Sequence, residues 1–355
     1  MENLSLPSPY GEDFRMTTMP DPARLLAEVG VVVIGRNEGD RLIRCLDSVV
    51  GQVRAIVYVD SGSTDGSCEV ATQRGIQVVN LDMSQPFSAA RARNVGFVRL
   101  RKLYPEVRYV QFVDGDCEVL PGWLLAAATV LKQDLLVAAV CGALRERHPD
   151  RSVFNRICSV EWNWPMAGEV SAFGGNVMLR STLLAAVGGY NNQVIAAEDD
   201  ELGVRLRKAG GKIIRLDRES MIHDADMTRL SQWWTRAMRC GYAFAAVAAL
   251  HGAPPERKFV RELRRTVVWG GVLPLLVLLL LWPTQGWSLV LLLRYPLVML
   301  KTIQATRRRG FSGFDSVAWG ISCGCAPLPG MVGVAKFYLT RRDRQPPQII
   351  EYKKG

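Results

Sequence analysis

The chain has 355 residues, of which 48% are hydrophobic and 22% charged, and its formal net charge is +10. This composition is that of a globular chain, and the length allows one large domain plus a substantial extension. The eight cysteines include no CxxC pair, which argues against a zinc site or a disulfide framework. The N-terminus shows no secretory signal, so we expect reduced thiols and a folded part that stays in the cytoplasm.

Strand and helix patterns alternate through the first half of the chain. Apolar runs predict strands at 29–34, 55–59, 77–81, 109–113 and 137–144. Helical patterns run through Leu42, Leu46 and Val49, and then over 67–74, 88–103, 122–132 and 198–209. This alternation predicts an α/β fold, a mostly parallel sheet flanked by helices, with ligands at the carboxyl ends of the strands. Between these elements, residues 152–189 suggest a loop-rich acceptor region.

The last third of the chain contains two uncharged runs. Residues 266–293 are interrupted by Pro274 and by a turn at 283–286. Together with 294–300 they predict two short, closely spaced helices, and a second uncharged run covers 316–335. Basic clusters flank both runs, which favours cytoplasmic flanks and hairpins or re-entrant elements. The alternative is a set of buried or interfacial helices that never cross the bilayer, which Arg294 supports. A membrane partner is favoured over nucleic acid, because no nucleic-acid module is recognised.

Two carboxylates follow the strand expected at 109–113. Asp114, Gly115 and Asp116 come directly after it, so the strand end delivers both carboxylates to one point, and the glycine allows close approach to a ligand. Oxygen ligands in this arrangement suit Mg²⁺ or Mn²⁺ bound to a diphosphate. The alternative is a hydrogen-bonded Asx turn.

Polar residues also follow the first three strands, at 35–38, 60–66 and 92–96. Such groups could bind a nucleotide base and ribose through donor and acceptor contacts. Each could instead be an ordinary helix cap, and Ser63 or Asp65 could cap the helix expected at 67–74.

Four acidic residues, Glu198, Asp199, Asp200 and Glu201, open a later helix. Either they interact favourably with the helix dipole, or one of them is a general base that takes a proton from an acceptor hydroxyl. Two aromatic residues, Trp162 and Trp164, either stack on a sugar ring or pack in the core.

The chain resembles the family 2 glycosyltransferases, which have a GT-A fold, over residues 29–245. The resemblance rests on six motifs in order, VVVIGRNEGDRL, VDSGSTDGS, ARNVG, FVDGD, GGNVMLRSTLLAAVGGYN and EDDELGVRLRKAGGKI. It implies an inverting, metal-dependent transferase of the hexosyltransferase type that uses a nucleotide-sugar donor and Mg²⁺ or Mn²⁺.

The resemblance assigns the nucleotide-sugar site to residues after the first strands. Asp60 and the backbone around Glu38 are implied at the base, with Asn37 and Ser63 in the same motifs. Arg93 is either a ligand of the diphosphate or a solvated surface residue, and the same holds for Arg91.

The resemblance also assigns the reacting centre. It implies Asp114 at the ribose, Asp114 and Asp116 at the metal-bound diphosphate, and Asp199 as the catalytic base with Glu198 beside it. A downstream residue, His223, either completes the metal's ligand set or is an ordinary loop histidine.

A stretch further on is similar to the QxxRW element of processive family members. Its residues Gln232, Trp233 and Arg236 are more closely spaced than in that element, which indicates the addition of a single sugar.

We therefore expect a mobile arm at 1–27, a GT-A domain at 28–250, a membrane-associated helical region at 251–345 and a tail at 346–355. The expected location is the cytoplasmic face of the cell (inner) membrane. A lipid-linked saccharide acceptor would explain this attachment, in the biosynthesis of a polysaccharide or glycoconjugate. Two alternatives are a nucleotidyltransferase, for which GRNEGD is a poor match to the phosphate loop, and a non-catalytic nucleotide-sugar-binding membrane scaffold.

Overall fold

The computed structural model describes residues 21–343, which group into two compact units. Unit 1 contains the chain up to Arg147 together with Trp162–Asn192 and Glu198–Asp224, and unit 2 contains the remaining segments. Most of the expected N-terminal arm and the expected tail lie outside the described residues. The part of that arm that is described contains a short helix, α1 (Pro22–Leu26). The domain boundaries at 250 and 345 stay predictions.

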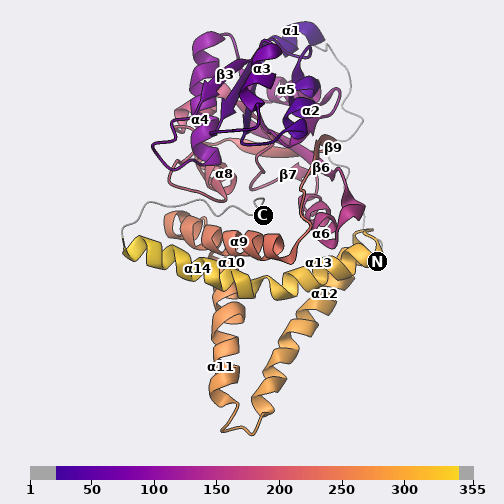
Figure 1. The fold of residues 1–355 in the computed structure, drawn as a ribbon, viewed down its shortest axis with the longest axis vertical. Coiled ribbons are helices and arrows are strands. Elements are labelled where there is room, and N and C mark those ends of the chain that lie inside the picture. Colours follow the sequence, from indigo (N-terminus) through magenta and orange to yellow (C-terminus); the bar gives the residue numbers. More distant parts are fainter. Residues whose placement is uncertain (1–20, 344–355) are drawn as a thin grey trace. The chain divides into compact units, whose positions relative to one another are not determined.

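Unit 1 is built on one mixed sheet with the strand order β3-β2-β1-β4-β8-β6-β9-β5 (Figure 1). The parallel strands of its first half are β1 (Val29–Gly35), β2 (Ala55–Asp60), β3 (Gln77–Asn80) and β4 (Tyr109–Asp114). The strands of the second half are β5 (Cys117–Val119), β6 (Val137–Glu146), β7 (Gly168–Glu169), β8 (Val177–Arg180) and β9 (Lys212–His223). The first four strands, and β6, confirm the sequence prediction.

The central strands are buried because both faces of the sheet are covered. Alternate residues of β1 belong to different core clusters, Val31 and Val33 on one face and Val32 and Ile34 on the other. One face packs against α1, α2 (Asp40–Val49), α3 (Ser67–Gln73) and α5 (Trp123–Gln133), and the other against α4 (Ala89–Leu103), α7 (Ser181–Ala186) and α8 (Glu198–Lys208). A continuous apolar run such as VGVVVIG is therefore what a doubly covered parallel strand requires.

The expectation of a loop-rich segment at 152–189 is wrong for most of its length. It contains α6 (Val153–Trp162), β7, β8 and α7. Strand β8 has four residues and lies between β4 and β6, antiparallel to both. A strand this short offers no periodicity, and its neighbours in the sheet, which stabilise it, are distant in sequence.

Unit 2 is helical. Its elements include η1 (Pro149–Arg151), α6, α9 (Leu230–His251), α10 (Val260–Val267), η2 (Val268–Val272), α11 (Leu273–Leu280), η3 (Trp287–Leu293), α12 (Arg294–Arg308), α13 (Gly313–Cys325) and α14 (Pro327–Arg342). Two continuous helices, Val260–Leu280 and Trp287–Arg308, form the arms of a hairpin that stands off the α9, α13 and α14 layer (Figure 1).

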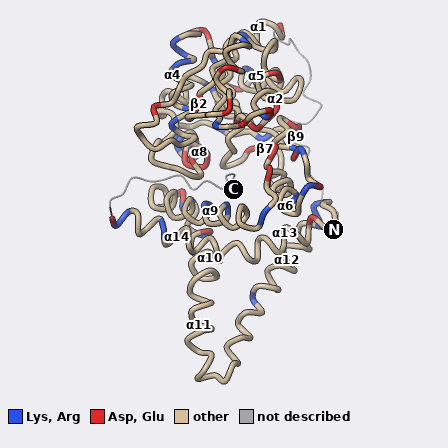
Figure 2. Tube along the Cα trace, viewed as in Figure 1, with Lys and Arg blue, Asp and Glu red and all other residues tan. Residues whose placement is uncertain are grey.

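The hairpin arms are each long and apolar enough to cross a membrane. Helices α13 and α14, bent by 40° at their junction, together satisfy the same criterion. Residues 266–293, which include the tip of the hairpin, carry no charge, and α11 is tan throughout in Figure 2. Few residues in the apolar windows of the two arms are buried. The sequence prediction of two closely spaced helices is confirmed, although Pro274 does not break the first arm. Within this arm, the π-helical segment η2 lies just before Pro274. Such segments accommodate local changes of the helical hydrogen bonding.

Helices α9 and α14 pack with their backbones nearly in contact. A Cβ placed on Gly241 would lie 1.9 Å from the carbonyl oxygen of Gly330, and one on Gly333 would lie 1.9 Å from that of Met238. Glycine is therefore required on both helices, because the obstructing atoms are backbone atoms that cannot rotate away. This close approach fixes the crossing of the two helices.

We expect Gly241→Ala to destabilise unit 2 by about 1–3 kcal/mol, because the added methyl group overpacks a backbone contact. The measurement is the apparent Tm of the detergent-solubilised protein. Gly313→Ala, where only the flexible Arg307 side chain lies near, is the matched helical control. Equal Tm values for the two variants would contradict the close packing.

Candidate functional site

The loops after β1 and β2 are tied to each other at the edge of the sheet. The backbone N–H of Asn37 donates to Ser63 Oγ at 2.9 Å, and Asn37 Oδ1 accepts from the N–H of Thr64 at 2.7 Å. The N–H of Gly39 donates to Asp65 Oδ2 at 2.9 Å. These hydrogen bonds of Asn37 and Ser63 thus hold the two loops against each other.

The helix after β2 has Gly66 as its N-cap, and Asp65, not Ser63, accepts hydrogen bonds from its first residue. Asp65 Oδ1 accepts from the N–H of Ser67 at 3.1 Å and from its hydroxyl at 2.6 Å. Burial raises the pKa of the Asp65 carboxyl, but its hydrogen bonds with Ser67 and Gly39 together outweigh burial and leave the pKa below its usual value. Glu38 forms an ion pair with Arg41 at 2.9 Å.

Asp60, at the end of β2, is buried and already engaged. Its Oδ2 accepts from the N–H groups of Gly62 and Ser63 at 2.9 and 2.8 Å, and its Oδ1 accepts from Tyr58 Oη at 2.9 Å. The Tyr58 pKa is raised, first by burial and then by the neighbouring Asp60 carboxylate, so the phenol stays a donor. Asp60 therefore holds the turn that carries Ser63, and any contact with a ligand would use its remaining lone pairs.

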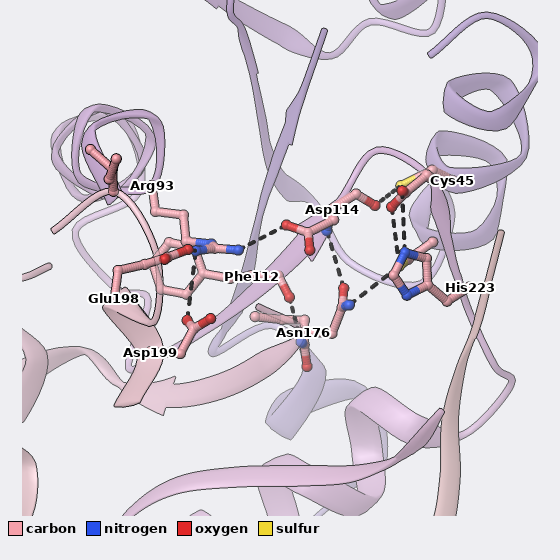
Figure 3. A network of polar contacts seen from close by, with 12 residues as sticks. Cys45, Arg93, Phe112, Asp114, Asn176, Glu198, Asp199 and His223 are labelled. Carbon is pink, nitrogen blue, oxygen red and sulfur yellow. Dashed lines mark hydrogen bonds and ion pairs between the residues drawn. The ribbon is translucent and has the colours of Figure 1, made fainter. Parts of the chain in front are cut away.

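The centre of the site is a buried arginine from α4 (Figure 3). Arg93, 2% exposed, donates through Nη2 to Asp114 Oδ1 at 2.9 Å and through Nη1 to Glu198 Oε1 at 2.8 Å. Its Nη1 also lies 3.6 Å from Asp199 Oδ1. One guanidinium thus joins the end of β4 to the start of α8, and the alternative of a solvated Arg93 is excluded.

The second arginine of this helix, Arg91, has a different function. Its Nη1 donates to the carbonyl oxygens of Gln85 and Pro86 at 2.9 and 2.8 Å, and its Nη2 contacts the carbonyl of Asp82. Arg91 therefore holds the loop before α4 in shape.

The end of β4 is positioned by the loop before β8. The N–H of Asp114 donates to Asn176 Oδ1 at 3.1 Å, and Asn176 Nδ2 contacts Cys117 Sγ at 3.2 Å. A Cβ on Gly175 would lie 2.3 Å from Arg93 Nη2 and 2.6 Å from Asp114 Oδ2. The GGN sequence therefore allows this loop to approach the ion pair closely.

The glycine between the two aspartates approaches the backbone of β1. The N–H of Gly115 donates to the carbonyl of Ile34 at 2.8 Å, and a Cβ there would lie 3.1 Å from the same oxygen. The close approach expected at Gly115 is thus to a neighbouring strand.

The two aspartates of DGD point to different partners. Asp114 contacts Arg93, whereas Asp116 Oδ2 lies 3.2 Å from His223 Nε2. Strands β5 and β9 pair antiparallel with Cys117 opposite His223, which brings the histidine to the DGD turn. The imidazole also stacks on Trp162, with ring centroids 4.3 Å apart and an interplanar angle of 16°. Trp162 therefore packs on the candidate metal ligand.

Ligand atoms of Asp116, Cys117 and His223 lie within 4.8 Å of one another. Burial raises the pKa of the Cys117 thiol well above its usual value, so this sulfur stays protonated and is a poor ligand for a hard cation. The carboxylate and imidazole are donors that suit a divalent metal. The chemistry of this donor set therefore fits a Mn²⁺ or Mg²⁺ ion, with the metal's identity open.

Asp199 lies in the first turn of α8, 13% exposed at its side chain. Burial raises the pKa of its carboxyl well above the usual range, the Arg93 guanidinium opposes that shift, and the carboxylates of Glu198 and Asp114 add to it. A carboxylate with a raised pKa is a stronger base than an exposed one. The arrangement is therefore suited to accepting a proton.

Sequence reasoning missed two residues that contact this centre, Asn176 and Tyr190. Asn176 lies in the GGN motif, whose two glycines signal close backbone approach. The Tyr190 ring lies 5.3 Å from the Arg93 guanidinium, and its burial raises the pKa of the phenol. The residues Gln232, Trp233 and Arg236 lie on α9 in unit 2, where Arg236 pairs with Glu161 at 2.5 Å.

Comparison with known families gives two matches. Residues 30–183 match the family described as glycosyl transferase family 2, and residues 157–229 match the one described as the N-terminal domain of galactosyltransferase. These matches support glycosyl transfer over nucleotidyl transfer.

Two curated proteins are similar to parts of the chain. A TPR repeat-containing protein of Synechococcus elongatus is 39% identical over 66 residues, 19% of this chain and 16% of that protein. Glycosyltransferase AglE of Haloferax volcanii is 25% identical over 194 residues, 51% of this chain and 62% of that protein. The chain therefore matches less than two thirds of the length of either relative.

Two solved structures share the fold. Mannosyltransferase PcManGT from Pyrobaculum calidifontis, in complex with GDP-Man and Mn²⁺, has a TM-score of 0.57 and 17% identity, covering 89% of both chains. TarS 1-349 of S. aureus has a TM-score of 0.50 and 15% identity, covering 89% of this chain and 92% of its own. Together with the sheet and its flanking helices, this similarity confirms the GT-A fold.

We expect Arg93→Met to destabilise unit 1 by about 3–5 kcal/mol near pH 8, because three carboxylates then lose their buried cation. Without Arg93 the folded-state pKa of Asp199 rises further. Protonation of Asp199 then stabilises the folded variant. Its loss of stability relative to the parent chain therefore grows as pH rises from the usual aspartate pKa of about 4 through the raised folded-state pKa of Asp199. The measurement is the apparent Tm at pH 5 and pH 8, with Arg101→Met, on the exposed side of α4, as control. A deficit equal at both pH values would contradict this account.

Proposed function

We propose that the chain is an inverting hexosyltransferase that uses a nucleotide-sugar donor, because residues 30–183 match glycosyl transferase family 2. The observation that carries the proposal is the buried Arg93, which contacts both Asp114 and the first turn of α8. Through it, the carboxylate proposed to bind the donor and the carboxylate proposed as base are held on one cation.

We assign the nucleotide to the loops after β1 and β2. Asn37, Glu38, Asp60 and Ser63 form or brace this edge of the sheet, and Asp114 is proposed to bind the ribose. Arg93 acts as a positioning residue in this scheme, because its guanidinium is already shared among acidic side chains.

Asp199 is the proposed catalytic base. Its carboxylate takes the proton of the acceptor hydroxyl, while that oxygen forms a bond to the anomeric carbon and the bond from this carbon to the diphosphate breaks. The electron pair leaves with the nucleoside diphosphate, and attack from the opposite side inverts the anomeric centre. Glu198, beside the base, takes up one guanidinium N–H of Arg93 and so fixes the arginine against Asp199.

Asp116 and His223 would hold the metal, with Asp114 on the same turn. The ion, when bound, would neutralise charge that develops on the departing diphosphate. An imidazole ligand is unusual for Mg²⁺, which favours oxygen ligands and retained waters, so we propose Mn²⁺ as the preferred ion. The PcManGT complex with Mn²⁺ supports this choice.

We further propose a lipid-linked saccharide acceptor and a location at the cytoplasmic face of the cell membrane. The apolar hairpin of unit 2 and its basic flanks support membrane attachment. A saccharide carried on a membrane lipid would remain near a transferase attached in this way, as the biosynthesis of a polysaccharide or glycoconjugate requires.

The test is release of nucleoside diphosphate from a panel of nucleotide sugars by the detergent-solubilised full chain. We expect one donor to be used and Asp199→Asn to lower kcat by about 10²–10⁴-fold, because the proton acceptor is lost. Asp200→Asn, the next residue of the same helical turn, is the matched control and should change kcat less than about threefold. Tight donor binding without turnover on any acceptor would instead favour the scaffold alternative.

For the metal, we expect His223→Ala to weaken Mn²⁺ binding at least about tenfold, since one of the proposed protein ligands is removed. The measurement is calorimetric titration of Mn²⁺ into the protein with nucleoside diphosphate present, which does not depend on turnover. Cys117→Ser is the control, because a protonated thiol contributes no bond to the ion. Loss of binding in the serine variant, with His223→Ala unaffected, would reverse the ligand assignment.

A further inference from the structure

Unit 2 contains a cavity of about 310 Å³ that the proposed transfer chemistry does not use. Its walls come from α6, α9, α10, η2, α12, α13 and α14, and all of its lining residues belong to unit 2. Three tryptophans, Trp233, Trp269 and Trp319, contribute to these walls. The volume is at the lower end of the range for small-molecule sites, about 300–1,000 Å³, and suits a compact head group.

The charges that line the cavity are unbalanced. Arg236 is neutralised by Glu161, with N–O distances of 2.5 and 3.0 Å. Within residues 21–343, the guanidinium groups of Arg265 and Arg294 form neither an ion pair nor a hydrogen bond, although both residues line the cavity. Apart from Glu161, which pairs with Arg236, Glu262 is the one acidic residue among the described residues that line the cavity.

The position of Arg294 makes its lack of an anionic partner costly. It lies at the start of α12, inside the hairpin arm Trp287–Arg308, where most neighbours along the chain are apolar. Its guanidinium lies over the Trp269 ring, 4.6 Å from the centroid. A charged residue in an apolar membrane segment is expensive unless it meets a counter-charge. The cation–π contact offsets part of this cost and leaves the five N–H donors for an anion.

The occupant is indicated by the surroundings of the cavity. The two hairpin arms that supply Arg265, Trp269 and Arg294 expose apolar side chains along their length, including Leu278 at 68% and Leu279 at 64%. A ligand that fills the cavity with an anionic group could therefore lay an apolar chain along the hairpin. A water-soluble anion would leave that surface uncovered.

We propose that this cavity binds the phosphate or diphosphate group of a membrane lipid, with Arg265 and Arg294 as the cations that hold it. Guanidinium groups match phosphate oxygens in geometry, and a phosphomonoester carries about −1.5 to −2 charges at pH 7. The tryptophans close the cavity around the head group. That this lipid is the sugar acceptor rests on the proposed function, whereas the binding itself does not.

The test uses the full chain in micelles of dodecyl maltoside, an uncharged detergent without phosphate, with binding followed by tryptophan fluorescence. The probes are dodecyl phosphate, dodecanol and inorganic phosphate. We expect dodecyl phosphate to bind at least about tenfold more tightly than either of the others, because only it supplies both the charge and the chain. Equal binding of dodecanol would overturn the anionic site, and equal binding of inorganic phosphate would overturn the lipid as its source.

The variants Arg265→Gln and Arg294→Gln are each expected to weaken dodecyl phosphate binding about tenfold or more. Arg261→Gln, on the same helix as Arg265 but outside the cavity, is the matched control and should bind within about twofold of the parent chain. Equal losses in all three variants would show general attraction to a basic surface and overturn the proposal. Arg265→Lys and Arg294→Lys, which keep the charge, guard against misfolding and should retain part of the binding.

Donor hydrolysis, measured on the same preparations, separates this proposal from the proposed function. Binding of dodecyl phosphate by a chain that releases no nucleoside diphosphate would sustain the cavity and refute the transferase. Normal hydrolysis together with no preference for dodecyl phosphate would support the transferase and refute the lipid-phosphate site in the cavity.

Discussion

The candidate site of unit 1 depends on one buried guanidinium. Arg93 comes from α4, yet its contacts are with the end of β4 and the first turn of α8, three parts of the chain that meet only in the folded state. Removing charged groups from water is unfavourable unless their partners are well placed, so this ion-pair cluster requires all three elements at once. The glycine at position 175 is a consequence, since any side chain there would occupy the space of the ion pair.

Much of this architecture was predictable because its signals are local. Apolar runs such as 29–34 are continuous and end in glycine or aspartate, and the DGD and EDDE motifs stand at element boundaries. The contacts among them were not predictable in detail. Nothing in the local sequence distinguishes Arg93, which is buried among carboxylates, from Arg91, which holds a loop through backbone carbonyls, because both lie in one helix two positions apart. Strand β8 was missed for the same reason, since its stability comes from distant neighbours.

The two units of the chain differ in how their arginines are paired with acidic groups. Unit 1 gathers Asp114, Glu198 and Asp199 around one buried cation, Arg93. Unit 2 places basic residues beside apolar helices and leaves two guanidinium groups of its cavity without an anion from the described chain. Arginine is therefore paired with carboxylates in the site of unit 1, whereas in the cavity of unit 2 it is available to an added anion.

The antiparallel direction of β8 fixes the position of Asn176, the residue just before this strand. Strand β8 runs antiparallel to β4, and its first residue, Val177, pairs with Phe112 near the end of β4. Asn176 is thus held in place from its C-terminal side by backbone pairing. Before it, β7 pairs with β9, so residues 170–175 connect two points that are both fixed in the sheet. A change in the length of this short connection would be taken up between β7 and β8, so the hydrogen bond from Asp114 to Asn176 would persist.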